Sequence, residues 1–188
     1  MNLISIFIAS VLTENIILTK FLGICPFMGT SNREKGALGM GLSVTLVVFI
    51  SGIIGYLLYY YVLIPTNTEY LRTILFVLVI ASMVQSLDLI IKKMFPKIHE
   101  LLGIFLPLIA ANCAVLGIAF LAIDYQYNFV EMMVFTIGSG LGFTFLIYIY
   151  ATIREKLEQR AIPASFKGVP IALIIAGIMA MIFSRYGL

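Results

Sequence analysis

Two cysteines, Cys25 and Cys113, are the residues of this sequence best suited to hold a metal. Each is followed four residues later by a glycine, within Phe21–Gly29 (FLGICPFMG) and Ala110–Gly117 (AANCAVLG). A thiol in an apolar helix is usually a small packing group, and a disulfide is an alternative if the two sulfurs face each other. The repetition favours metal ligation, because two thiolates supply half of a four-coordinate zinc or iron–sulfur site. A second chain of the same kind would supply the other half.

Other candidate residues carry charge within apolar segments. Glu14 and Lys20 indicate either an ion or proton path or polar groups satisfied by neighbouring side chains, since ionisable residues are costly in a membrane. Asp88 lies four residues before Lys92 and is interpreted as one half of a helix pair. We assign no catalytic residue, and one chain alone offers no complete active site.

The composition excludes a soluble globular protein. Of the 188 residues, 62% are hydrophobic and only 11% are charged, whereas soluble domains average about a quarter charged residues. Apolar runs of roughly 20 residues, long enough to cross a hydrocarbon core, recur throughout. The sequence therefore predicts an all-α integral membrane protein of one domain, 1–188, that does not bind nucleic acid. We expect six transmembrane helices, near residues 3–28, 39–63, 71–91, 101–122, 129–151 and 168–186.

The basic residues predict the orientation of these spans. Loops 1–2, 3–4 and 5–6, with the adjoining helix ends, hold nine Lys and Arg residues, and the opposite side holds only Arg72 and Arg185. Positive charge accumulates on the cytoplasmic side, so these three loops are expected in the cytoplasm and both termini outside. The predicted location is the cytoplasmic (inner) membrane of a prokaryote.

The two halves of the chain resemble each other. Gly39-Met40-Gly41-Leu42 with Thr45 matches Gly138-Ser139-Gly140-Leu141 with Thr144, and the two Cys-x-x-x-Gly motifs occur in the same order. Three spans per half predict two inverted repeats, about 1–95 and 96–188, with sites where interrupted helices meet. The glycines do not form a dinucleotide fingerprint, because no strand precedes them. We interpret them as helix-contact residues: Gly36, Gly39, Gly41, Gly138, Gly140 and Gly142.

Interruptions are expected in the first and fourth helices, next to the cysteines. Pro26 directly follows Cys25, and Pro107 lies six residues before Cys113. Proline removes a backbone donor and disfavours helical geometry at the residue before it. Non-helical backbone at membrane depth must be buried in protein or line a cavity. The two cysteines should therefore approach each other near the middle of the membrane.

Four segments resemble the A subunit of the Rnf electron-transport complex: TENIILTKFLGICPFMG, GALGMGLSVT, LLGIFLPLIAANCAVLG with IREKLEQRAIPASFKG, and ALIIAGIMA. The related E subunit of the sodium-pumping NADH:quinone oxidoreductase is similar. The resemblance implies six spans and pairing with a homologous, oppositely oriented E-type sister subunit. It also implies that Cys25 and Cys113 hold a 2Fe–2S cluster together with two cysteines of that sister. Ala110-Ala111 stands where hydroxyl residues such as Thr would be expected.

The resemblance further implies a subunit of an ion-translocating ferredoxin:NAD⁺ oxidoreductase. Such a complex moves Na⁺ or H⁺ and includes further flavin- and iron–sulfur-carrying subunits. The residues leave open a different class of protein, a small secondary transporter without a redox cofactor, because inverted repeats with broken helices are typical of transporters. The paired thiols separate the two hypotheses, since a transporter has no need of iron.

Overall fold

The computed structural model describes residues 3–13, 22–23, 34–66, 69–94, 112–158 and 168–184. Its elements, in chain order, are α1 (Leu3–Ile8), η1 (Ala9–Thr13), α4 (Glu34–Leu58), η2 (Tyr59–Leu63), α5 (Ile64–Thr66), η3 (Glu69–Leu71), α6 (Arg72–Met94), α9 (Cys113–Asp124), α10 (Phe129–Glu158) and α11 (Val169–Ser184). In these ranges every regular element is a helix, which confirms the all-α part of the predicted fold class for them. The η1 and η2 segments are π-helical turns.

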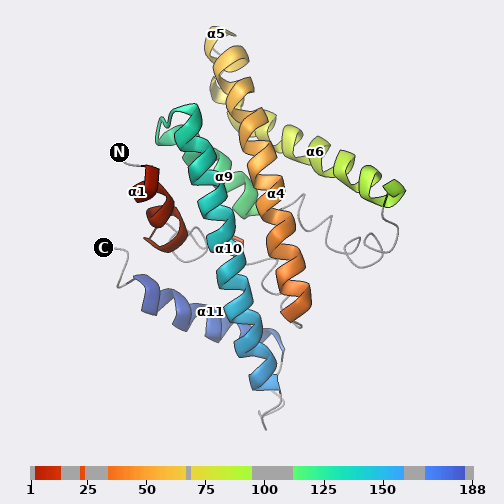
Figure 1. The fold of residues 1–188 in the computed structure, drawn as a ribbon, viewed down its shortest axis with the longest axis vertical. Helices are drawn as coiled ribbons and strands as arrows, with labels where there is room; N and C mark the ends of the chain where they lie inside the picture. Colours follow the sequence, from red (N-terminus) through yellow and green to blue (C-terminus); the bar gives the residue numbers. More distant parts are fainter. Residues whose placement is uncertain are drawn as a thin grey trace.

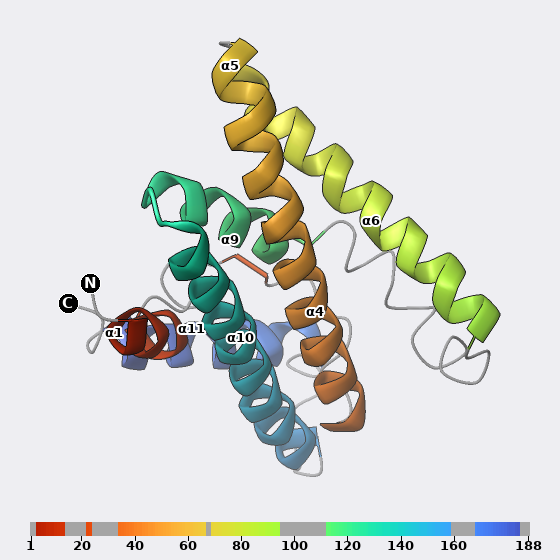
Figure 2. The same ribbon diagram turned by 45° about the horizontal axis from the view of Figure 1, so that its top comes forward.

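The two longest helices, α4 and α10, form the centre of the molecule. They run antiparallel, and α1, α6, α9 and α11 surround them (Figures 1 and 2). Small residues allow them to pack closely. A Cβ atom on Gly41 would lie 2.7 Å from Thr144 Cγ2, and one on Gly140 would lie 2.7 Å from Thr45 Cγ2. The contact is therefore reciprocal between the two matched Gly-x-x-x-Thr segments.

Hydroxyl groups mark the centre of this crossing. The Oγ1 atoms of Thr45 and Thr144 lie 3.1 Å apart, and each lies 2.9 Å from a carbonyl oxygen of its own helix. Threonine can make such bonds to the carbonyl one turn earlier without leaving the helix. Close packing of this kind confirms the predicted contact role of Gly41 and Gly140. A Cβ atom on Gly39 would meet nothing within 4 Å in the described chain, so that role does not extend to Gly39 here.

The core lies between α10 and its neighbours. Its largest fully buried side chains include Met40 of α4, Ile118 of α9 and Phe143 and Tyr150 of α10. The Tyr150 hydroxyl donates a hydrogen bond of 2.7 Å to the Ala172 carbonyl and so ties α10 to α11. A buried tyrosine hydroxyl needs such a partner.

The outer surface is strongly apolar. Leu42, Ile74, Leu78, Met181 and Ile182 are each more than half exposed. By length and composition, two helical stretches of the described chain can cross a membrane, Gly36–Leu63 and Phe129–Leu157; shorter apolar helices cover Arg72–Ser86, Cys113–Asp124 and Val169–Ile182. Exposed patches of this kind mark membrane or protein contacts. These features agree with a membrane protein.

Most predicted spans coincide with helices of the structure. The spans at 39–63, 71–91, 129–151 and 168–186 correspond to the helix from α4 through α5 and to α6, α10 and α11. The fourth span was expected from residue 101, but α9 begins at Cys113, and residues 101–111 lie outside the described part. For the first span, the structure describes helix over 3–13 and a turn at 22–23. The count of six, the inverted repeats and the single domain 1–188 stay predictions.

Candidate metal centre

Cys113 is the first residue of α9, and the backbone just before it is not helical. Asn112 has φ −76° and ψ 113°, which is extended backbone, and its side-chain oxygen accepts a hydrogen bond of 3.0 Å from the Ala114 amide. This is an N-cap, in which a short polar side chain satisfies one of the free amides at a helix start. A helix therefore starts at the second cysteine, while the predicted interruption of a longer span involves residues outside the described part. Pro107, to which the sequence attributed it, lies outside the described residues.

Two residues that precede the first cysteine motif, Leu22 and Gly23, contact this helix start. Leu22 and Gly23 form a turn, and the Gly23 amide donates a hydrogen bond of 3.0 Å to the Cys113 sulfur, 90 residues away. Gly23 has φ +94°, a conformation open mainly to glycine. An amide of non-helical backbone thus reaches the thiol. Cys25 and Pro26 lie outside the described residues, so the approach of the two sulfurs stays a prediction.

Close packing fixes the Gly23 turn against α9 and α10. A Cβ atom on Gly23 would lie 3.0 Å from a ring carbon of Phe143 and 3.1 Å from the Ala114 Cβ. A Cβ atom on Gly117 would lie 2.5 Å from Leu22 Cδ1. Gly117 follows Cys113 by four residues, about one helical turn, so both face the same side of α9. The Cys-x-x-x-Gly spacing in α9 therefore places the thiol one turn from the small residue that leaves room for Leu22.

Hydrogen-bond donors lie near the Cys113 sulfur. The residue occupies a helix N-terminus, where free amides and the helix dipole attract anions, and the Gly23 amide adds a donor. Cys113 is a free thiol. A side-chain donor is also left over, because Asn112 Nδ2 is buried without a hydrogen-bond partner in the described ranges. Among the residues the structure describes, no three His, Cys, Asp or Glu side chains are grouped to hold a metal ion.

The ionisable residues singled out in the sequence do not enter this site. Glu14 and Lys20 lie outside the described ranges, and Asp88 belongs to α6, with a side chain that is not described. Lys92, one turn beyond Asp88, is exposed in the last turn of that helix. The proposed ion path therefore stays untested.

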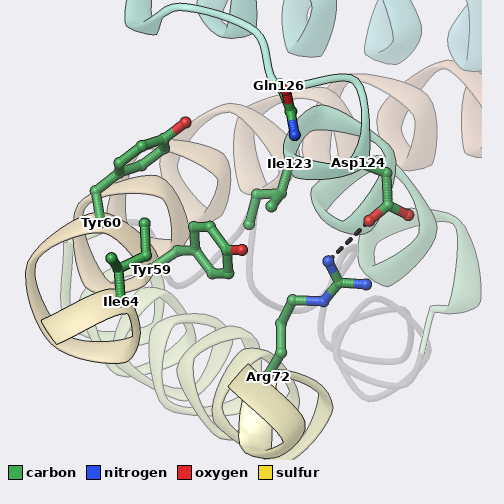
Figure 3. A pocket seen from close by; sticks show the side chains of 7 residues that line it. All are labelled: Tyr59, Tyr60, Ile64, Arg72, Ile123, Asp124 and Gln126. Carbon is green, nitrogen blue, oxygen red and sulfur yellow. Dashed lines mark hydrogen bonds and ion pairs between the residues drawn. The ribbon is translucent and has the colours of Figure 1, made fainter. Parts of the chain in front are cut away.

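A second polar region lies at the far end of α4 and α9. A cavity of about 420 Å³ is lined by Tyr59, Tyr60, Ile64, Arg72, Ile123, Asp124 and Gln126 (Figure 3). Across it, Arg72 Nη1 and Asp124 Oδ1 form an ion pair of 2.7 Å, and the Arg72 guanidinium lies 4.8 Å from the centre of the Phe120 ring. Arg72 is 28% and Asp124 50% exposed. None of the described lining residues is a thiol, and the ion pair joins α6 to α9.

Three residues of these regions were missed in the sequence. Asn immediately before a helical residue is a common N-cap signal, so the role of Asn112 could have been inferred. Gly23 lies three residues before Pro26, to which the sequence analysis attributed the interruption. Its positive φ is known only from the structure. Asp124 is 52 residues from Arg72, and no local spacing links the two.

Comparison with known proteins assigns the chain to a family. Residues 3–188 match the family described as "Rnf-Nqr subunit, membrane protein". The chain is 46% identical to the A subunit of the Na⁺-translocating ferredoxin:NAD⁺ oxidoreductase complex of Acetobacterium woodii, over 97% of this chain and 95% of that protein. It is 47% identical to the A subunit of the ion-translocating oxidoreductase complex of Syntrophotalea carbinolica, over 98% and 96% of the two chains. The chain therefore belongs to the Rnf–Nqr family of membrane subunits.

Proposed function

We propose that this chain is the A-type subunit of an ion-translocating ferredoxin:NAD⁺ oxidoreductase and relays electrons within the membrane. The relay is a 2Fe–2S cluster, for which Cys25 and Cys113 supply half of the ligands and a homologous sister subunit supplies the rest. The names of the relatives support the complex and the type of subunit. The observation that best supports a cluster at this site is the hydrogen bond from the Gly23 amide to the Cys113 sulfur.

The residues around Cys113 fit such a group. Thiolate sulfur is the ligand that iron–sulfur clusters use, and amide donors to the sulfurs tune their potentials. The site offers the Gly23 amide, the N-terminus of α9 and the buried Asn112 Nδ2. Cys25 follows Gly23 by two residues, a stretch of chain that spans at most about 7 Å. When bound, the cluster supplies a one-electron carrier at a depth that cofactors on either membrane face can reach.

The chain's own residues hold and shield this carrier. Cys25 and Cys113 bind iron, and the Gly23 amide stabilises charge on the Cys113 sulfur. Ala114 and Phe143 pack against Gly23, and Leu22 of the same turn packs against Gly117, so apolar groups shield the site from water. A hydrocarbon core about 30 Å thick is too wide for direct transfer between its faces, so a buried relay is needed.

The finer topology belongs to the same proposal. We place six spans in two inverted repeats, with both termini outside the cytoplasmic membrane, because this orientation accounts for the charge distribution of the loops. The proposed sister subunit has the opposite orientation. The reciprocal contacts of Gly41 with Thr144 and of Gly140 with Thr45 support a two-fold relation between the halves. The coupled ion is Na⁺ or H⁺, and the complex includes flavin- and iron–sulfur-carrying subunits.

Low-temperature EPR, with iron and acid-labile sulfide analysis, tests the proposal on the purified membrane complex. Wild type is compared with Cys25→Ser, Cys113→Ser and the control Ser43→Ala, which removes a hydroxyl bonded to the Gly39 carbonyl within α4. We expect a reduced 2Fe–2S signal in wild type and control, and its selective loss in each cysteine variant with the complex still assembled. Equal iron content and spectra in all four would favour the transporter without a redox cofactor.

A further inference from the structure

Asn112 carries a buried donor that the described part of the chain leaves without an acceptor. The residue is 3% exposed, and within that part its Nδ2 atom has no hydrogen-bond partner, whereas its Oδ1 accepts from the Ala114 amide at 3.0 Å. Leaving a buried donor unpaired costs about 1–3 kcal/mol. Such groups are rare in native structures and call for an explanation, for example a missing ion.

The capping bond fixes which end of the Asn112 amide is unpaired. A backbone N–H can only donate, so the side-chain atom that faces Ala114 must be the oxygen. Because the amide is planar, this bond also holds the NH₂ group in one direction. Asn112 could not turn Nδ2 toward another acceptor without giving up the cap of α9. The donor is therefore held in place before any acceptor binds.

The surroundings favour sulfur as that acceptor. Asn112 is bonded directly to Cys113, and the Gly23 amide already donates to the Cys113 sulfur. Ala114 and Val115, the next residues of α9, are fully buried. A water molecule would need two to four polar partners to be stable there, and a bound cluster brings several sulfur acceptors.

We propose that Asn112 Nδ2 donates a hydrogen bond to a sulfur atom of the cluster held at Cys113, either a thiolate or an inorganic sulfide. This inference rests on the proposed function. Asn112 is then a positioning residue with two roles, since one end of its amide caps α9 and the other end raises the reduction potential. Reduction adds negative charge to the cluster, and hydrogen bonds to charged acceptors are the stronger ones, so the donor stabilises the reduced form more.

Two variants of Asn112 in the intact complex separate these roles. Asn112→Ser keeps a capping oxygen and removes the amide donor, whereas Asn112→Ala removes both. In an EPR-monitored redox titration, we expect both variants to lower the reduced-to-oxidised ratio at fixed ambient potential about tenfold, which is about 59 mV for one electron. Ser139→Ala is the matched control, because Ser139 Oγ is the other buried polar side-chain atom without a partner in the described chain. Its potential should equal that of wild type.

The outcomes distinguish this inference from the proposed function. A wild-type potential in Asn112→Ser, with the 2Fe–2S signal intact, would overturn the inference and leave the relay in place. Absence of any 2Fe–2S signal in wild type would overturn both. If neither variant assembles, wild type labelled with ¹⁵N only at asparagine side-chain amides is decisive. We expect a nitrogen hyperfine coupling to the reduced cluster that changes with the label, and the inference fails without it.

Discussion

The two halves of the chain meet in two regions that differ in how their polar groups are used. At the α4–α10 crossing, Thr45 and Thr144 bond to each other and to their own helices. At the Gly23–α9 contact, a backbone amide donates to a thiol, and the Asn112 amide keeps a donor that no described residue pairs. The two threonine hydroxyls of the first region are paired with each other, whereas the second region holds a donor, unpaired within the described ranges, beside a thiol. Local departures from packing rules of this kind concentrate at functional sites.

The glycines of the two regions serve different physical needs. Gly41 and Gly140 are helical residues for which only the absence of a Cβ matters, because each faces a threonine of the other helix. Gly23 needs both space and a positive φ. The same substitution to alanine therefore measures packing in one region and packing plus backbone strain in the other.

Gly23→Ala should have the largest effect. Alanine disfavours positive φ by about 1–2 kcal/mol, and the new Cβ would crowd Phe143 and Ala114, for which overpacking costs about 1–3 kcal/mol. We expect thermal unfolding of the purified complex at clearly lower temperature and a reduced iron content, because the amide moves away from Cys113. Gly39→Ala is the control, since its Cβ meets nothing within 4 Å in the described chain. Equal stability and iron content in the two variants would show that the Gly23 turn is not needed.

Gly41→Ala and Gly140→Ala should come next, and the two should be alike. Each new Cβ would approach the Cα atom of the opposing threonine, at 2.9 Å for Thr144 and 3.0 Å for Thr45. Backbone must then move, at a cost of about 1–3 kcal/mol for each variant. Thermal unfolding measures that cost, and the EPR spectrum of the assembled complex should not change. A large difference between the two variants would contradict the reciprocity of the crossing.

The sequence predicted the crossing better than the cysteine region. The all-helical fold, the ranges of α4, α6, α10 and α11 and the contact role of Gly41 and Gly140 follow from hydrophobic length and small-residue patterns, which are local. A break near Cys113 was also expected, and the structure shows that α9 starts there with an N-cap at Asn112. Pro107 lies outside the described residues, so its part in that break stays a prediction.

Contacts over long sequence separation could not be predicted. The bond between Gly23 and Cys113 joins residues 90 apart, and it depends on a positive φ that a glycine permits but does not require. Asp124 and Arg72 likewise come together only because the end of α9 lies near the start of α6 (Figure 3). The symmetry of the two motifs suggested that the cysteine stretches meet, yet it did not identify which atoms touch.

Removing the threonine hydroxyls should have a smaller effect. Hydrogen bonds between membrane helices average about 0.6 kcal/mol, so Thr45→Val and Thr144→Val should each destabilise the complex by about that amount. The double variant should cost less than the sum of the two, because it leaves no hydroxyl without its partner. A double-mutant cycle by thermal unfolding measures the coupling. Strict additivity would show that the 3.1 Å contact between the two hydroxyls contributes nothing.

Removing the ion pair of Arg72 and Asp124 should have the smallest effect on stability, and it should be the only effect that depends on salt. Both side chains are partly exposed, and ion pairs at such sites contribute about 0–1 kcal/mol because water and salt screen them. Asp124→Asn should therefore lower the unfolding temperature slightly at low ionic strength and not at all near about 1 M salt. At high salt, Arg72→Lys should lower the unfolding temperature more than Asp124→Asn does, because the guanidinium also stacks on the Phe120 ring. A large effect of Asp124→Asn at every ionic strength would instead show that the ion pair is shielded from solvent.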